Sequence, residues 1–214
     1  MSLLSRRRGA RPVARLPQDL ARALPRGCAV LGAVPLRPDG ECWLVAAPHA
    51  LLRLGRSNGE ASALPASTGW DRISRASWDA ERRTLTLHLL HDAHGPRVLS
   101  VPDAVRRPPD PRGAGEAEEA GGESGAGAGA VVHDVDERGF ARALRQRVDS
   151  AIVHHVSRAL PDGTRATASV RRGADGVLYS TTEPESSEAQ SDELGRALRD
   201  LERSAREAVG LPTR

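Results

Sequence analysis

The sequence predicts an α+β protein: an antiparallel sheet capped by an amphipathic helix, then a three-strand meander and a closing helix. Three observations predict this class. Short apolar runs are separated by Pro-Asp-Gly, Ser-Asn-Gly and similar turn signals, as is typical of antiparallel strands. Two later segments repeat apolar residues every three to four positions, which is typical of amphipathic helices. The length of 214 residues allows one large domain or two small ones.

The composition limits which residues can form the core and what the net charge implies about binding. Aromatic residues make up 2% of the chain, so the core must consist mainly of Leu, Val, Ile and Ala. All 31 basic residues are arginine, which with the heavy use of Ala, Gly and Pro indicates a GC-rich genome. The net charge of +3 is therefore weak evidence that each arginine is placed to bind phosphate.

No apolar run reaches the roughly 18–20 residues of a membrane span, so no integral membrane segment is predicted. Ser5-Arg6-Arg7 resembles the start of a twin-arginine signal, but no apolar segment follows it. We therefore predict a cytoplasmic location. Cys28 and Cys42 are too few for a disulfide framework and are expected to be separate thiols.

The first fifteen residues are interpreted as a disordered basic arm. They hold five arginines and no acid: Arg6, Arg7, Arg8, Arg11 and Arg15. Such an arm attracts nucleic acid, an anionic membrane or an acidic protein surface without sequence selectivity.

The next segment is predicted to form a short helix and several strands. Pro17 to Leu24 is expected to be helical, with proline in the first turn. Strands are predicted at 28–36, 41–47 and 50–56, and residues 60–69 are interpreted as an irregular connection.

The segment TGWDRISRASWDAERRTLTLHLL predicts a hairpin whose aromatic residues are core anchors. Trp70 and Ile73 are expected on a single helical turn that covers the core. With a four-residue turn at 80–83, one register satisfies three cross-strand pairs: Trp78 with Leu85, Ala76 with Leu87, and Ser74 with Leu89. The alternative, a base-stacking surface, would need these aromatics exposed.

A strand at 96–101 is followed by residues 106–130, rich in Gly, Ala, Pro and Glu, which are interpreted as a disordered insert. A helix then begins after a cap at Asp134 or Asp136. Its apolar stripe has a spacing of four: Phe140, Leu144, Val148 and Ile152.

After this helix the pattern predicts three strands joined by turns at Pro161-Asp-Gly163 and Gly173-Ala-Asp-Gly176. A closing helix is expected from Ser187 to Val209. Its buried side would carry Leu194, Leu198, Leu201 and Ala205, and its water-facing side Asp192, Glu193, Arg196, Arg199 and Arg203.

The WDRI…SWD hairpin, the preceding strands and the helix with its single Phe resemble bacterial pleckstrin-homology-like (PH-like) and GRAM-like domains. GWDRISRASWDAERRTLTL and RALRQRVDSAIVHHV look like segments of uncharacterised protein families of high-GC, actinobacterial-type bacteria. The resemblance covers about residues 27–155 and implies a strongly bent sheet closed by the helix. It brings no catalytic residue, and the first hairpin offers only Arg37 where phosphoinositide-binding relatives cluster basic residues.

The predicted organisation has four parts. They are a basic arm at 1–15, a PH-like domain at 16–105 with 131–155, an insert at 106–130, and a meander with its closing helix at 156–214.

Several candidate chemistries were weighed against simpler structural roles. His88, His91 and His94 could ligate a metal, but no acid or cysteine besides Asp92 completes the set. The acids between His133 and Glu137 serve equally well as helix caps. His154 and His155 would point to opposite faces of a strand.

Two further motifs are incomplete. Ser124 in Gly-Glu-Ser-Gly-Ala lacks the second glycine of a nucleophile elbow. The glycines at 121–129 neither follow a strand nor precede a lysine, so they do not form a phosphate-binding loop. The sequence thus predicts no catalytic residue, no metal site and no cofactor.

The leading prediction is a non-enzymatic binding or scaffold protein that contacts another protein through a sheet edge or the terminal helix. The alternative prediction is an electrostatic nucleic-acid binder that uses the arm from Arg6 to Arg15.

Overall fold

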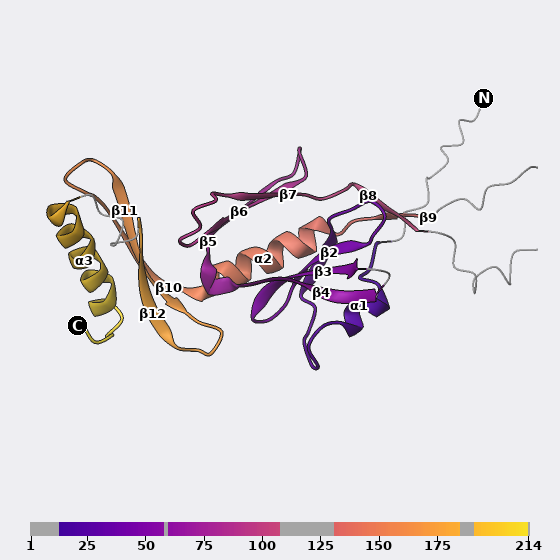
Figure 1. Ribbon diagram of the computed structural model, residues 1–214, viewed down its shortest axis with the longest axis horizontal. Coiled ribbons are helices and arrows are strands. Elements are labelled where there is room, and N and C mark those ends of the chain that lie inside the picture. Colours follow the sequence, from indigo (N-terminus) through magenta and orange to yellow (C-terminus); the bar gives the residue numbers. More distant parts are fainter. Residues whose placement is uncertain (1–12, 58–59, 108–130, 185–190, 214) are drawn as a thin grey trace, which may run out of the picture.

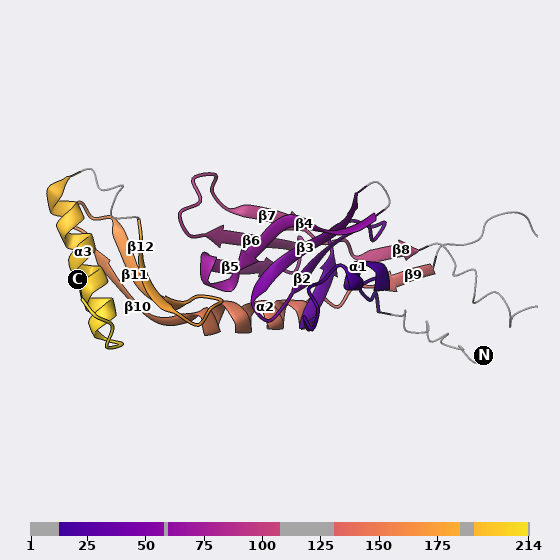
Figure 2. The same ribbon diagram turned by 60° about the horizontal axis from the view of Figure 1, so that its bottom comes forward.

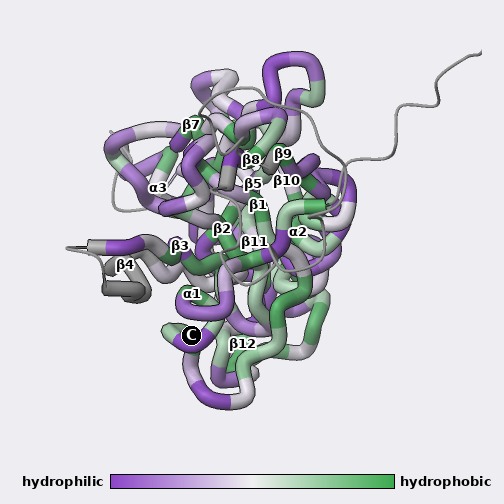
Figure 3. The backbone as a smooth tube through the Cα atoms, turned by 90° about the vertical axis from the view of Figure 1, so that its right-hand side faces the viewer, coloured by the Kyte–Doolittle hydropathy of each residue, from purple (hydrophilic) through white to green (hydrophobic). Residues whose placement is uncertain are grey.

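The computed structural model of the chain describes residues 13–57, 60–107, 131–184 and 191–213. It confirms the α+β class, with antiparallel sheets and helices (Figure 1). The elements form two bodies arranged end to end, which we call the N-terminal body (up to residue 151) and the C-terminal body (from residue 152). In the end-on view β1 and β2 fall near the middle of the backbone trace, and many outer loops are hydrophilic (Figure 3).

The first sheet has four antiparallel strands in sequence order: β1 (Gly32–Pro35), β2 (Cys42–Ala46), β3 (Ala50–Ser57) and β4 (Glu60–Gly69). Every residue of β2 is buried, because both faces of this strand are covered. Cys42 and the half-buried Cys28 are both free thiols, as predicted. Cys28 lies outside β1, which begins four residues later than the predicted strand.

The interpretation of residues 60–69 as an irregular connection is wrong. They form β4, which pairs with β3 from Glu60 opposite Ser57 to Gly69 opposite Ala50. Apart from one threonine, the segment has none of the β-branched or aromatic residues that favour strands. The strand therefore depends on backbone pairing with β3 rather than on local propensity.

Helix α1 (Gln18–Arg22) confirms the predicted short helix and covers one face of the first sheet. Leu20 packs there against Trp43 and Val45 of β2. Leu44 and Ala46 alternate with these residues along β2 and belong to the hydrophobic cluster on the opposite face.

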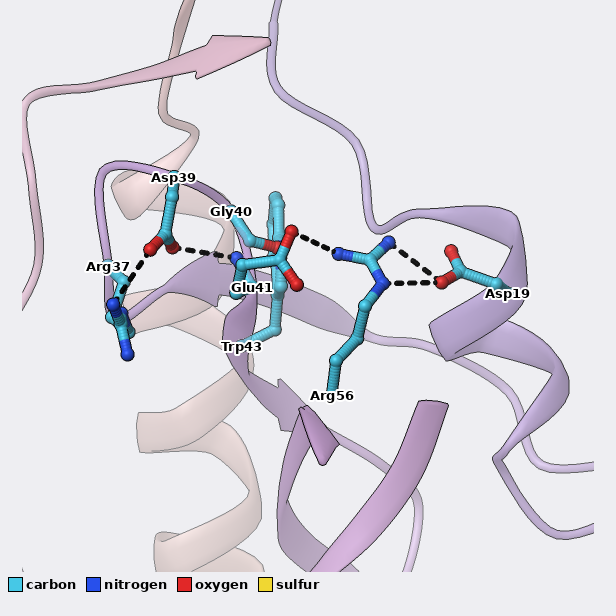
Figure 4. Close-up of polar contacts among 7 residues, drawn as sticks. All are labelled: Asp19, Arg37, Asp39, Gly40, Glu41, Trp43 and Arg56. Atoms are coloured by element: carbon cyan, nitrogen blue, oxygen red, sulfur yellow. Dashed lines mark hydrogen bonds and ion pairs between the residues drawn. The ribbon is translucent and has the colours of Figure 1, made fainter. Parts of the chain in front are cut away.

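Arg56 of β3 holds α1 against this sheet (Figure 4). Its guanidinium lies 2.7 Å from a carboxylate oxygen of Asp19 in α1 and 2.7 Å from one of Glu41. The hydrogen bond with Glu41 raises the pKa of Arg56 despite partial burial. Burial alone would raise the pKa of Asp19, but the bond and charge of Arg56 hold it below its usual value.

The second sheet contains the Trp hairpin: β5 (Ile73–Asp79), β6 (Thr84–Leu89) and β7 (Arg97–Ser100), paired in that order. The pairs Trp78 with Leu85 and Ala76 with Leu87 are confirmed. The predicted pair of Ser74 with Leu89 is wrong.

A bulge in β5 accounts for this difference. The register shifts between Ile73 and Arg75, so that Ile73 lies opposite Leu89. The shift lets Ile73 become fully buried. Ser74 instead donates its hydroxyl to the carbonyl of His88 at 3.3 Å.

The predicted helical turn before β5 is confirmed as a 3₁₀ turn, η1 (Trp70–Arg72). Trp70 and Ile73 both pack into the core of the N-terminal body. The indole N–H of Trp70 donates to the carbonyl of Ala47 at 2.9 Å, which fixes the ring.

Strands β8 (Ala104–Arg107) and β9 (Val131–Asp134) form a ribbon that the sequence did not predict. Arg106 and Arg107 pair with Val132 and Val131, so the predicted boundary of the insert at residue 106 is wrong. Strand β9, the partner of β8, lies far from it in the sequence, so a local sequence pattern cannot predict this pairing. Residues 108–130 lie outside the described residues.

The end of the predicted basic arm is also ordered. Val13 bridges to Asp134, whose carbonyl accepts the amide of Ala14 at 2.6 Å. The arm prediction is therefore wrong for Val13 and Ala14, because the buried Ala14 joins the cluster beneath α1. Residues 1–12 lie outside the described residues.

Helix α2 (Glu137–Ala151) confirms the predicted capped and amphipathic helix. The carboxylate of Asp136 accepts the amide of Gly139 at 2.9 Å. Phe140, Leu144 and Val148 are buried against both sheets. Strand β10 begins directly after Ala151, so the chain passes from α2 into the C-terminal body without a loop.

The predicted meander and closing helix are confirmed: β10 (Ile152–Ala159), β11 (Arg165–Arg172), β12 (Leu178–Glu183) and α3 (Asp192–Glu207). The hydroxyl of Ser191 caps α3. Leu198 and Leu201 pack on Ala168 and Val170 of β11. This cluster is separate from those of the N-terminal body, so α3 closes its own core at the far end of the molecule (Figure 2).

Polar contacts join the two bodies at η1. Arg171 of β11 is 3% exposed, and its guanidinium donates to the carbonyls of Ile73 at 2.9 Å and Asp71 at 3.1 Å. Burial lowers the pKa of Arg171. The hydroxyl of Tyr179 donates to the Asp71 carboxylate at 2.8 Å. A hydrogen bond of 2.8 Å between the His91 ring and the Thr181 hydroxyl joins the two bodies at a second place, outside η1.

The approach of β1 to α2 gives a first prediction. A Cβ at Gly32 would lie 2.8 Å from Cα of Phe140, a backbone atom that cannot rotate away. Gly32→Ala should therefore lower the free energy of unfolding by roughly 1–3 kcal/mol. Urea denaturation measures this change, with the exposed β7 substitution Ser100→Ala as control. A variant within about 0.5 kcal/mol of the original would contradict this packing.

The junction gives a second prediction. Burial and the hydrogen bond with Asp71 raise the pKa of Tyr179 from 10.0 to about 12. The folded protein thus holds this proton more tightly than the unfolded chain does. The associated stability is complete below the unfolded pKa and should be lost as the pH rises from about 10 to about 12.

The pKa can be measured directly because Tyr179 is the single tyrosine of the chain. An absorbance titration of the folded protein should give a midpoint well above 10, with Tyr179→Phe as the blank. Urea unfolding of Tyr179→Phe should lack the alkaline loss of stability. A midpoint at the value of free tyrosine would contradict the contact with Asp71.

Candidate functional site

An open groove with a volume of about 830 Å³ lies between strand β5 and helix α2. Residues 74–78 of β5 form one side. The other side is formed by α2 and the first residue of β10: Ala141, Arg142, Leu144, Arg145, Val148, Asp149 and Ile152. One wall of the groove is therefore a strand, and the other is the flank of a helix.

Strand β5 lies at the edge of its sheet, because β6 is its one neighbour among the described strands. The hydrogen bonds show which backbone groups face outward. The amide of Leu90, just after β6, donates to the carbonyl of Arg72 at 2.9 Å, so even-numbered β6 residues face β5. Thr86 lies opposite Ser77, and the backbone groups of Ser77 therefore point into the sheet.

It follows that Ala76 and Trp78, on either side of Ser77, direct their backbone N–H and C=O groups toward the groove. Such outward groups form a template on which another strand can pair. The edge is short and is exposed beside a helix rather than covered by one.

Apolar side chains line the inner part of the groove. Leu144 and Val148 belong to the buried stripe of α2, and Trp78 and Ile152 are half-buried against the same core. Trp78 is fixed by its position opposite Leu85. The apolar surface is therefore held by the core and needs no rearrangement to accept a side chain.

Three arginines stand on the rim of the groove. Arg75 extends from β5, and Arg142 and Arg145 extend from α2; all three are exposed. Among the described residues none of them has an ion-pair partner. Within the part of the chain that the structure describes, Asp149 is the one acid that lines the groove.

Asp79 ends the strand and shapes its turn. Its carboxylate accepts the backbone amides of Arg82 at 2.9 Å and Glu81 at 3.0 Å. The hydrogen bond from the Arg82 amide is the main reason why the pKa of Asp79 lies below its usual value. The end of β5 is therefore fixed by its own turn.

A second hollow, of about 260 Å³, lies at the junction of the two bodies. Trp70 and Asp71 of η1 line it together with Ser150 and Ala151 of α2. The end of α2 thus lies beside the start of β5, and the helix and strand run in opposite directions along the groove.

Arg15, the one arginine of the predicted basic arm that the structure describes, does not line this groove. Arg15 is exposed and follows the residues that bridge to β9. The other four predicted contact residues, Arg6, Arg7, Arg8 and Arg11, lie outside the described residues. The electrostatic role of this arm stays a prediction.

The structure gives structural roles to the acids weighed as metal ligands. Asp136 caps α2, and Glu137 pairs with Arg83 at 3.1 Å. The carbonyl of Asp134 accepts the Ala14 amide. No group of three or more His, Cys, Asp or Glu in the described part of the chain could hold a metal ion.

The remaining candidates are dispersed. His88 lies on β6, whereas His91 bonds to Thr181 of the other body. His154 and His155 lie opposite Val170 and Ser169 on alternate faces of the meander, as predicted. Ser124 and the glycines at 121–129 lie outside the described residues.

Sequence reasoning missed the groove, although parts of its signal were present. Arg142 and Arg145 stand three apart on the polar side of a predicted helix, and Trp78 stands in a predicted hairpin. That these residues share one groove depends on which strand lies at the sheet edge beside α2. The local pattern does not contain this information.

No helix among residues 13–57, 60–107, 131–184 and 191–213 is both long and apolar enough to cross a membrane. No protein-family model matches the chain, and no curated protein matches it.

The position of Trp78 gives a third prediction. Of the three tryptophans, Trp43 and Trp70 are buried and Trp78 is half-buried in the groove wall. Trp78 should therefore supply most of the tryptophan fluorescence that acrylamide quenches. Trp78→Phe should reduce the quenching constant severalfold, while Trp43→Phe should not reduce it. Equal quenching in both variants would contradict this placement.

Proposed function

We propose that this chain is a non-enzymatic binding protein that holds an extended segment of another protein in the groove between β5 and α2. The segment adds as a further strand on β5. One observation carries this proposal: the outward backbone groups of Ala76 and Trp78 lie directly beside an apolar helix wall.

In strand addition, different contacts supply the affinity and the selectivity for the peptide. Backbone hydrogen bonds supply affinity that depends little on sequence, and alternate side chains supply selectivity. Each hydrogen bond contributes about 0.5–1.5 kcal/mol net. Apolar side chains packed on Leu144 and Val148 would add about 25 cal/mol per Å² of buried apolar surface. Both contributions are needed, because ordering an extended peptide has a substantial entropic cost.

Other observations support a binding role. The two walls are anchored independently of any ligand, β5 by its cross-strand pairs and α2 by its buried stripe. Antiparallel strands precede α2 in the chain, and the PH-like assignment stays a prediction. Since a fold hosts many functions, the groove rather than this order supports the proposal.

The proposal is tested by blocking one edge of the sheet at a time. Ala76→Pro removes an outward N–H from β5, and Val98→Pro removes one from β7 at the opposite edge. Val98 lies opposite Thr86, whose backbone faces β5, so its own N–H points outward. Proline is tolerated at such edge positions, so both variants should fold.

The probe is a random peptide display library selected on the full chain. Enriched peptides should bind at least tenfold more weakly to Ala76→Pro and with unchanged affinity to Val98→Pro. They should also shield Trp78 from acrylamide. If no peptide is enriched, or if both proline variants bind equally well, strand addition on β5 is refuted.

A further inference from the structure

We infer that the groove selects an acidic peptide: an extended segment in which apolar residues alternate with Asp or Glu. This inference rests on the proposed function and adds the chemistry of the partner. It follows from the charges on the rim of the groove, read together with its apolar lining.

The charges on the rim of the groove are not balanced. Arg75, Arg142 and Arg145 line the groove without an ion-pair partner among the described residues, against the single acid Asp149. A few exposed arginines elsewhere have such a partner, as Arg97 has in Asp92 and Arg203 in Asp200. The groove therefore carries net positive charge, and its complement is a negatively charged ligand.

The geometry of an added strand sets the spacing of apolar and acidic residues along the ligand. Side chains of a strand added to β5 alternate between the two faces of the sheet. Residues on the face of Trp78 meet Leu144 and Val148 and should be apolar. The intervening residues lie on the face of Arg75, where a carboxylate can reach its guanidinium. Arg142 and Arg145 reach the ligand from the opposite rim.

The lining of the groove favours an acidic peptide over nucleic acid. Single-stranded nucleic acid is held by aromatic rings whose faces are free for stacking. Among the described residues that line the groove, Trp78 is the one aromatic, and its side chain packs against the core. The groove thus offers an apolar wall and edge hydrogen bonds, which suit a peptide backbone rather than bases.

The two ends of the groove also differ in charge. The end of α2 lies beside η1, so Asp149 stands near the start of β5 and Arg142 near Trp78. Acidic residues of the ligand should concentrate over β5 from Arg75 to Trp78. Asp149 should repel an acidic residue placed at the other end.

The test uses two peptides of equal length, one alternating valine and glutamate and one alternating valine and lysine. Fluorescence anisotropy at low salt measures their affinity for the full chain. The glutamate peptide should bind at least tenfold more tightly. The double variant Arg142→Glu with Arg145→Glu should weaken its binding roughly tenfold or more, since two attractions become repulsions.

Two further variants control for loss of structure. Arg138→Glu changes an exposed arginine of the same helix outside the groove and should leave the affinity unchanged. Asp149→Asn should raise the affinity for the glutamate peptide a fewfold, a gain that a damaged fold would not produce. An equal loss in Arg138→Glu, or no gain in Asp149→Asn, counts against the inference.

The remaining outcomes separate this inference from the proposed function. If display peptides bind but are neutral, or if the lysine peptide binds as well as the glutamate peptide, acidic selection is refuted and strand addition stands. If the library enriches nothing, both fail. If oligothymidine binds more tightly than the glutamate peptide and loses affinity in the double variant, the groove is a nucleic-acid site and the inference is overturned.

Discussion

The packing of α2 against both sheets is the contact on which the rest of the N-terminal body depends. Phe140, Leu144 and Val148 bury one side of the helix, and Gly32 lets β1 approach its backbone. Because a helix has one buried side here, residues in between must face water. Arg142 is one of these. The same packing therefore creates the core, the wall of the groove and the charge on its rim.

The two bodies are joined by a different kind of interaction. Each has its own apolar core, but their junction is made by polar groups around Arg171. A buried cation is costly unless its hydrogen bonds are satisfied, and the carbonyls of Asp71 and Ile73 satisfy them. Tyr179 completes the contact through the Asp71 carboxylate. This network fixes the start of β5, and so one end of the groove.

The groove shows how an exposed sheet edge can serve binding without promoting aggregation. Outward backbone groups pair with any available strand, and proteins commonly place charges on such edges to prevent this. Arg75 on β5 has that effect toward a second copy of the chain, which would present the same positive charge. A negatively charged segment would meet no such repulsion. The same residue therefore both protects the edge and selects the proposed ligand.

The sequence by itself determined the elements whose signals are local. The apolar stripe and cap of α2, the closing helix α3, the meander turns and the pairing of Trp78 with Leu85 all follow from periodicity over a few residues. Each of these elements depends on residues that are close in the chain, so the local sequence pattern is enough to predict it.

Only the tertiary structure decided the features that depend on distant partners. Strand β4 and the β8–β9 ribbon exist because backbone groups pair across turns or across the long segment that begins at residue 108. The bulge at Ile73 reflects burial against α2, and the groove exists because β5 is an edge strand beside that helix. These contacts join residues far apart in sequence, and no local period of hydrophobicity records which strand will be left without a neighbour.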